Sequence, residues 1–216
     1  MTRAGAEVHM SIELRNVTKR YGRRIAVDSL DLDVNSGEVF AFLGPNGAGK
    51  TTTIKMIAGL LRPDRGRVAV CGHDCVTDPL EARMPLAYVP DQPFLYDKLT
   101  GREFLEFVAR MYNMDRPASL AGIERLTAMF EMGEFLDQLT EGYSHGMKQR
   151  IVLAAALLHN PKVLLIDEPM VGLDPRTVRI VKDLMIEMAR AGTTVFMSTH
   201  TRSEEHTSEL QSPNTI

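Results

Sequence analysis

The sequence predicts an α/β domain with a parallel β-sheet at its centre, an antiparallel β segment before that sheet and a helical insert. Three observations predict this fold. Runs that suit strands buried on both faces of a parallel sheet occur at 39–43, which is continuously apolar, and at 163–166 and 194–197. Segments that alternate apolar and polar residues precede the first run, and helical patterns separate the three runs. With 216 residues, 44% of them hydrophobic and 25% charged, the chain is long enough for one substantial core.

The antiparallel segment is expected at the beginning of the domain. Residues 12–17 alternate apolar and polar side chains, as a half-exposed strand does, and residues 25–34 repeat the pattern. A helix is expected after the first buried strand, because apolar residues recur at helical spacing from Lys50 until Pro63 and Gly66. These apolar residues are Ile54, Met56, Ile57, Leu60 and Leu61.

The helical insert is expected at about residues 98–145, since the pattern from 100 to 139 is mostly helical. The two remaining parallel strands follow it, with one helix between them. Asp174 is the expected N-cap of that helix and Pro175 its first residue. Its apolar stripe comprises Val178, Val181, Met185 and Met188.

Composition argues against two classes of protein. The formal net charge of -3 gives no broad electrostatic footprint for nucleic acid, so no nucleic-acid partner is expected. The longest apolar stretch, 151–158, falls far short of the roughly 20 residues that span a bilayer.

The N-terminus lacks the apolar region of a secretory signal, so we expect a cytoplasmic protein. Met10 is an alternative start, which would make residues 1–9 a non-native upstream extension.

A phosphate-binding loop follows the first buried strand. Residues 44–51 match G-x-x-x-x-G-K-[ST] in full, and the order strand, glycine-rich loop, helix is the context that this motif requires. Glycines let successive backbone N–H groups point inward, while the helix that follows presents its positive end. Lys50 is expected to reach the β- and γ-phosphates, and the Thr51 hydroxyl to bind Mg²⁺. The competing interpretation is a glycine-rich turn without a ligand. The loop and the threonine after it comprise Gly44, Pro45, Asn46, Gly47, Ala48, Gly49, Lys50, Thr51 and Thr52.

Acidic residues follow the second buried strand. Asp167 ends that strand, so its carboxylate emerges at the carboxyl edge of the sheet, where ligands of open parallel sheets bind. We expect it to bind Mg²⁺ directly or through water. Glu168 comes next and is expected to orient and polarise the water that attacks the γ-phosphate. His200 follows the last buried strand, at the same edge, and could contact the γ-phosphate. The competing interpretations are that Asp167 and Glu168 are acidic residues of a loop that caps a helix and that His200 is a structural histidine.

With these motifs in this order, the chain resembles the ATP-binding cassette family, the nucleotide-binding domains of ABC transporters, from about residue 12 to His200. The resemblance implies a P-loop NTPase (RecA-like) core. It identifies Tyr21 as the aromatic residue that stacks on adenine, 44–52 as Walker A and 163–168 as Walker B. It also identifies His200 as the switch histidine, and as the D-loop Gly172, Leu173 and Asp174.

The family signature, usually Leu-Ser-Gly-Gly-Gln, is altered here. The chain reads Tyr143-Ser144-His145-Gly146-Met147, which keeps the serine and the second glycine. The resemblance implies that the Ser144 hydroxyl and the Gly146 N–H, at a helix start, grip the γ-phosphate held by a second subunit. With Lys148-Gln149-Arg150 after it, the variant resembles exporter ATPases of the drug and antibiotic-resistance type.

The Q-loop also departs from the family pattern. The family glutamine follows a proline directly, whereas here Asp91 follows Pro90 and Gln92 comes one residue later. Asp91 could bind Mg²⁺ or a water, or Gln92 could shift into place, and the residues leave both open. Our hypothesis is that Asp91 couples the nucleotide site to the membrane subunit.

The function implied is that of the ATP-hydrolysing subunit of an ABC transporter, with ATP and Mg²⁺ as cofactors. Expected partners are a second nucleotide-binding domain, in a homo- or heterodimer, and transmembrane permease subunits, with the chain peripheral on the cytoplasmic face of the membrane. Export is the expected direction. The alternative is a regulatory or scaffolding subunit that binds ATP with little hydrolysis, suggested by the altered signature and Q-loop. A GTPase is disfavoured because the chain lacks an Asn-Lys-x-Asp motif.

The last residues do not continue the family pattern. Residues 202–212 match, codon for codon, the translation of a string that resembles a widely used sequencing-library adapter. We therefore expect residues 202–216 to be an artefactual tail and the domain, 10–201, to be C-terminally truncated. The alternative is a natural polar terminal helix starting near Ser203.

Overall fold

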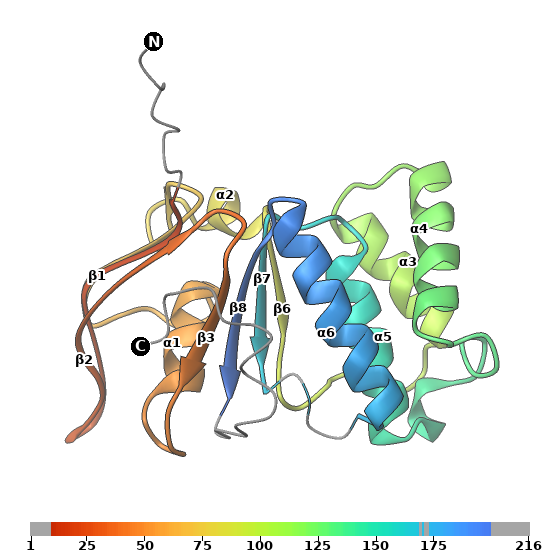
Figure 1. The fold of residues 1–216 in the computed structure, drawn as a ribbon, viewed down its shortest axis with the longest axis horizontal. Coiled ribbons are helices and arrows are strands. Elements are labelled where there is room, and N and C mark those ends of the chain that lie inside the picture. The colour runs from red at the N-terminus through yellow and green to blue at the C-terminus, as the bar shows by residue number, and fades with distance from the viewer. Residues whose placement is uncertain (1–9, 169, 171–172, 200–216) are drawn as a thin grey trace, which may run out of the picture.

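The computed structural model describes residues 10–168, 170 and 173–199. Two sheets and a group of helices make up these residues, with the antiparallel sheet and the helical insert at opposite ends and the parallel sheet between them (Figure 1). The described chain therefore has the expected α/β class, with an antiparallel sheet before a parallel one. Within the described residues, no helix is long and apolar enough to cross a membrane.

The antiparallel sheet has the strand order β2-β1-β4-β5. Its long strands are β1 (Met10–Tyr21) and β2 (Arg24–Asn35), and β4 (Arg65–Val70) and β5 (His73–Asp74) complete it. The alternating pattern of the sequence corresponds to one buried face, which carries Ile12, Leu14, Val27, Leu32, Val34, Val68 and Val70. The predicted half-exposed strands are confirmed.

The parallel sheet has the order β3-β8-β7-β6. It consists of β3 (Val39–Leu43), β8 (Thr194–Thr199), β7 (Val163–Asp167) and β6 (Leu86–Val89). Alternate side chains of β7 enter different cores, since Leu164 and Ile166 belong to one apolar cluster and Val163 and Leu165 to the other. Both faces of the sheet are thus covered, as the continuous apolar runs predicted.

The prediction that the first parallel strand is buried on both faces was wrong for most of β3. Only Phe40 is fully buried, with its ring stacked on Phe196 at a centroid distance of 5.2 Å, whereas Val39, Ala41, Phe42 and Leu43 are partly exposed. The reason is position. β3 is one of the two edge strands of the sheet and is the less completely covered of them, while β7 and β8 occupy the centre.

The helix after the phosphate loop is shorter than its apolar pattern indicated. α1 (Lys50–Ile57) buries Ile54, Met56 and Ile57 between the two sheets, but it ends well before Pro63. Gly59 adopts a left-handed conformation (φ +65°) and its N–H donates to the carbonyl of Met56, which ends the helix. Leu60 is consequently 62% exposed and is not part of the core.

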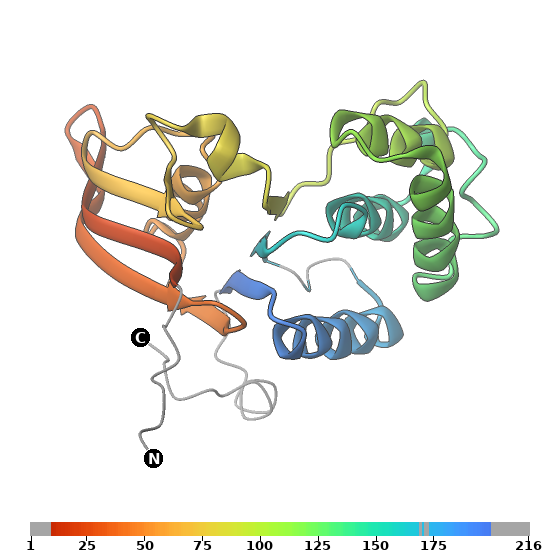
Figure 2. The same ribbon diagram turned by 90° about the horizontal axis from the view of Figure 1, so that it is seen from above.

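Helices cover the other face of the parallel sheet and form the insert. α5 (His145–Leu157) contacts β6, and α6 (Pro175–Arg190) contacts β3 and β8. α3 (Gly101–Met111), α4 (Arg116–Met129) and the 3₁₀ turn η1 (Thr140–Gly142) lie at the far end from the antiparallel sheet (Figure 2). The short α2 (Pro79–Arg83) precedes β6. Helices between 98 and 145 were predicted, and the structure places them there.

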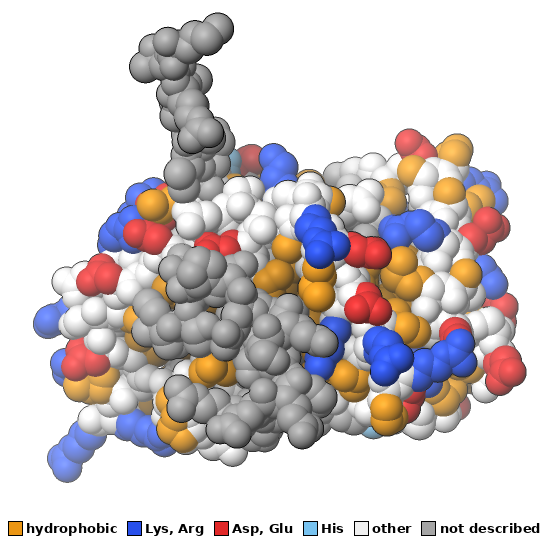
Figure 3. All heavy atoms as spheres, in the orientation of Figure 1, with side chains coloured by type: hydrophobic (Ala, Val, Ile, Leu, Met, Phe, Trp, Pro, Cys, Tyr) orange, Lys and Arg blue, Asp and Glu red, His pale blue; other side chains and the backbone are white. Residues whose placement is uncertain are grey.

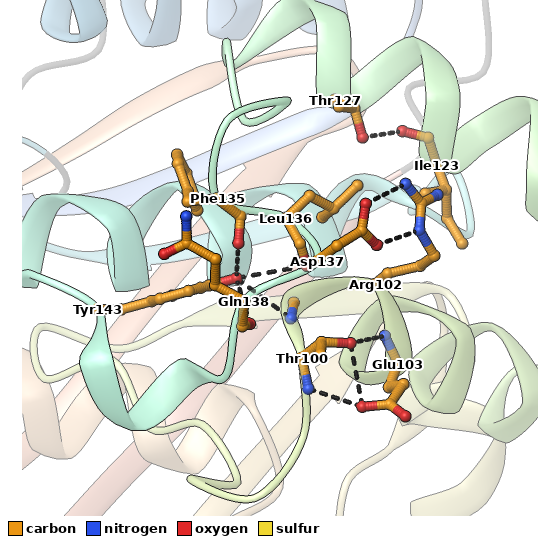
Figure 4. A network of polar contacts seen from close by, with 11 residues as sticks. Thr100, Arg102, Glu103, Ile123, Thr127, Phe135, Leu136, Asp137, Gln138 and Tyr143 are labelled. Atoms are coloured by element: carbon orange, nitrogen blue, oxygen red, sulfur yellow. Dashed lines mark hydrogen bonds and ion pairs between the residues drawn. The ribbon is translucent and has the colours of Figure 1, made fainter.

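A buried tyrosine hydroxyl ties the insert to the segment that starts α5 (Figure 4). The Tyr143 hydroxyl accepts a hydrogen bond from the Gly101 N–H (3.2 Å) and donates to the Phe135 carbonyl (2.6 Å). Thr100 caps α3 in a reciprocal arrangement with Glu103. Tyr143 directly precedes Ser144, so these contacts fix where α5 begins.

Removing this hydroxyl is expected to destabilise the domain. Tyr143→Phe leaves the Gly101 N–H without its partner in an apolar setting, which costs about 1–3 kcal/mol. Urea unfolding followed by circular dichroism measures the loss, with Tyr96→Phe, at a half-exposed tyrosine, as the control. Equal stabilities of the two variants would contradict this role of Tyr143.

Candidate nucleotide site

One cavity opens at the carboxyl edge of the parallel sheet, where the loop before α1 meets the end of β7. The edge is marked in Figure 1 by the arrowheads of β7 and β8. The cavity has a volume of about 420 Å³. The described residues that line it are Tyr21, Arg24, Ala26, Asn46, Gly47, Gly49, Lys50, Thr51, Thr52, Asp91 and Glu168.

The phosphate loop has the backbone geometry that its glycines predict. Gly47 and Gly49 have φ values of +83° and +90°, in the left-handed region that L side chains rarely adopt. A Cβ atom on Gly49 would lie 2.3 Å from the Ala26 carbonyl oxygen, so the loop and β2 approach too closely for a side chain. Gly49 caps α1 without a side-chain hydrogen bond, and the positive end of the helix therefore faces the cavity.

Lys50 is buried inside the loop with only 7% of its surface exposed. Its Nζ donates to the carbonyl oxygens of Gly44 (2.6 Å) and Pro45 (3.1 Å). Gly44, Pro45 and Ala48 are not among the described residues that line the cavity. The carbonyl groups of Gly44 and Pro45 therefore hold the lysine without belonging to the described lining. An ammonium group fixed this way is a preformed point charge for phosphate.

Asp167 is buried at the end of β7, directly before Glu168, which lines the cavity. Its Oδ1 accepts a short hydrogen bond from the Ser198 hydroxyl, and its Oδ2, also buried, has no hydrogen-bond partner. Ser198 lies opposite Asp167 on one side and opposite Phe42 on the other, so β8 connects β7 to the strand that enters the phosphate loop. A buried carboxylate oxygen without a partner fits a Mg²⁺ ion or its water, because Mg²⁺ prefers oxygen ligands.

Glu168 leaves the sheet in an unusual conformation. Its φ of +55° is left-handed, and its N–H donates to the Ser198 carbonyl (3.3 Å). Such a conformation costs energy for a residue with a side chain and is kept only where the surroundings hold it. The residue lines the cavity beside the loop, as the catalytic prediction requires.

At the altered Q-loop, the aspartate reaches the cavity. Asp91 lines it, and its Oδ1 accepts a hydrogen bond from the Gln92 N–H (2.8 Å). Gln92 is exposed and is not among the described lining residues. Nearby, burial raises the pKa of Tyr88 to about 12, with smaller contributions from Asp167 and Asp91. Of the two alternatives that the sequence left open, this structure brings Asp91 to the site.

The signature residues lie elsewhere. Ser144 is the N-cap of α5, and its Oγ accepts a hydrogen bond from the Met147 N–H (3.3 Å). Ser144 and His145 are exposed, and Gly146 is partly exposed. Among the described residues lining the cavity, none belongs to this segment. The helix start therefore presents its donors to the exterior.

The D-loop prediction is partly described. Asp174 is the N-cap of α6 as expected, with Oδ1 accepting from the N–H groups of Arg176 and Thr177, both at 3.0 Å. Arg150, in α5, donates to its Oδ2 at 3.4 Å. Leu173 packs against the core, while Gly172 and His200 lie outside the described residues, as do 1–9 and 202–216.

Sequence reasoning missed three residues of the site: Arg24, Ala26 and Ser198. Only Arg24 left a local signal. It lies directly opposite Tyr21 across the two-residue turn of the β1–β2 hairpin. Two alternating segments separated by such a short turn predict a hairpin, and residues paired in a hairpin share a face.

A phosphate loop at the head of a helix, beside a buried carboxylate at the end of a parallel strand, defines a P-loop nucleotide-binding domain. More narrowly, the chain belongs to the ABC transporter family, whose profile matches residues 27–171.

Similar proteins agree with this family. YhcH of Bacillus subtilis, an uncharacterised ABC transporter ATP-binding protein, is 39% identical over 194 residues, or 89% of this chain and 63% of YhcH. The daunorubicin resistance ATP-binding protein DrrA3 of Streptomyces coeruleorubidus is 39% identical, over 88% of this chain and 60% of its own. The Nod factor export ATP-binding protein I of Burkholderia orbicola is 37% identical, over 89% and 64%. The chain thus spans about three fifths of the length of these curated relatives.

Solved structures show the same fold. An ATP binding subunit of an ABC transporter superimposes with a TM-score of 0.84 at 32% identity, over 90% of this chain and 81% of the other. CbiO1 of Clostridium perfringens, part of the ABC transporter complex cbiONQ, gives 0.75 at 26% identity, over 89% and 79%. The expected core, with an antiparallel sheet before it and a helical insert, is therefore confirmed.

Proposed function

We propose that this chain is the ATP-hydrolysing subunit of an ABC transporter that acts in export. The observation that carries this proposal is the cavity, which gathers the phosphate loop, Asp91 and Glu168, the residue that directly follows the buried Asp167. Relatives named for daunorubicin resistance and Nod factor export support the direction of transport. A cytoplasmic position, peripheral to the membrane, follows from association with a permease.

The predicted site residues have distinct roles in this reaction. The backbone of the loop and Lys50 bind the phosphates, and Tyr21 stacks on the adenine. Thr51 and Asp167 would hold Mg²⁺, with Asp91 as a further candidate ligand. The ion, when bound, would supply positive charge that neutralises the phosphates during transfer. Glu168 accepts a hydrogen bond from the attacking water and orients it, so that ATP and water give ADP and phosphate.

We further propose that the site is completed by a second nucleotide-binding domain. The exposed start of α5, with Ser144 and the Gly146 N–H, supplies donors that this chain's own cavity does not use. The γ-phosphate held by a partner cassette would accept hydrogen bonds from these donors, and this contact would close the partner's site. ATP would then hold two cassettes together.

A substitution that keeps the helix cap tests this arrangement. Ser144→Asp retains a good N-cap, since Asp and Ser are equally favoured there, but places a negative charge where a γ-phosphate is expected. We expect folding stability to change by less than about 0.5 kcal/mol. ATP-dependent dimerisation, measured by light scattering, and ATP hydrolysis should both be lost. A variant that dimerises with ATP like the unmodified chain would refute the role of Ser144.

The surface that meets the permease is proposed to be the aromatic cluster that follows Asp91. Phe94 and Tyr96 are 73% and 50% exposed, and their rings pack edge to face at 5.8 Å. Tyr96 meets Phe107 of α3 in the same way at 5.7 Å. Exposed apolar clusters of this kind mark interaction sites. Because the cluster follows Asp91 closely in the chain, docking of the permease there would change the position of Asp91 in the cavity.

A phosphate-release assay on the full-length protein, reconstituted with its permease, tests the whole proposal. Transport-linked hydrolysis is the expected result. Nucleotide binding and dimerisation without appreciable phosphate release would instead establish the alternative, an ATP-binding regulatory subunit.

A further inference from the structure

The cavity contains a second cation that the motifs did not identify. Arg24 begins β2 and lines the cavity with Tyr21, its direct partner across the hairpin. Its Nη2 donates to the carbonyl oxygen of Gly47, in the middle of the phosphate loop, at 3.3 Å. Arg24 is thus paired with Tyr21 in the hairpin and hydrogen-bonded to the phosphate loop through Gly47.

The charge of Arg24 affects how the cavity can bind an anionic ligand. The described lining has two cations, Arg24 and Lys50, against two carboxylates, Asp91 and Glu168. Without Arg24, a polyanionic ligand would enter a cavity with more negative than positive side chains. Gly47 accepts only one of the five N–H groups of the guanidinium, so others remain for phosphate oxygens.

We propose that Arg24 is a nucleotide-binding residue that contacts the phosphate chain between the base and Lys50. Its hydrogen bond to Gly47 orients the side chain along the loop, and binding of the nucleotide joins the β1–β2 hairpin to the phosphate loop. Arg24 thereby makes affinity depend on the number of phosphates. This inference rests on the proposed nucleotide site, because it assigns one more contact within it.

The test compares Arg24→Ala with Arg23→Ala. Arg23 is an exposed arginine in the same hairpin turn and is not among the described lining residues, so it controls for long-range charge. Kd values for ATP, ADP and adenosine are measured by isothermal titration calorimetry on the purified full chain. Arg24→Ala should weaken ATP and ADP binding on the order of tenfold and adenosine binding by less than about twofold. Arg23→Ala should leave all three within about twofold.

Different outcomes separate the two levels of the proposal. Equal weakening of all three ligands by Arg24→Ala would show that Arg24 only props the hairpin and would overturn the phosphate contact. Unchanged affinities would overturn it too. If the unmodified chain bound no nucleotide, the proposed function itself would fail. Arg24→Lys, which keeps the charge but not the fork of donors, should recover part of the ATP affinity.

Discussion

Replacing Glu168 with glutamine is expected to abolish ATP turnover while ATP still binds. The two side chains have nearly the same shape, so the left-handed backbone and the Glu168 N–H bond to the Ser198 carbonyl are retained. An amide oxygen, however, is a far weaker base and carries no charge with which to polarise the attacking water. General-base catalysis contributes 100-fold or more, so kcat is expected to fall at least about 100-fold.

The measurement is phosphate release at saturating ATP, with ATP affinity determined in parallel. Glu187→Gln, at an exposed position on α6 away from the cavity, is the matched control and should behave like the unmodified chain. Glu168→Gln should also accumulate as an ATP-bound dimer, because it still binds ATP but does not hydrolyse it. Turnover of Glu168→Gln within a few fold of normal would assign the base to another residue.

Gly49→Ala is expected to have an effect of similar size, for a backbone reason. A methyl group at Gly49 would lie 2.3 Å from the Ala26 carbonyl and 3.1 Å from Val27, so the loop must move away from β2. The left-handed φ of +90° adds strain of about 1–3 kcal/mol. Because a displacement near 1 Å can cost 100-fold in activity, ATP turnover should fall about 100-fold.

Gly72→Ala separates the two causes. Gly72 has a similar φ of +84°, but an added Cβ would have nothing within 4 Å. Both variants should therefore lose stability in urea unfolding, whereas only Gly49→Ala should lose ATP turnover. If the two variants lost activity equally, strain alone would explain the result and the close approach to β2 would be unimportant.

Much of the fold could be predicted because its signals are local. The apolar run of β7 and the N-cap at Asp174 each depend on residues within one or two turns of chain. Where prediction failed, the position of a strand in its sheet or a helix-ending glycine that the apolar pattern did not take into account was responsible. β3 has the composition of a central strand but lies at the edge, and the apolar pattern beyond Ile57 continues past the point where Gly59 ends α1.

The sequence alone predicted the phosphate loop and the acidic end of β7, since each follows from residues adjacent in the chain, and the family resemblance implied a helix start at Ser144. Tertiary structure decided which of these share a cavity. It brought Asp91 rather than Gln92 to the site, added Arg24 and Ser198, and left the start of α5 outside. The physical reason is that strand order and strand register bring together residues that are far apart in the chain. The residues that meet do not by themselves determine that order or register.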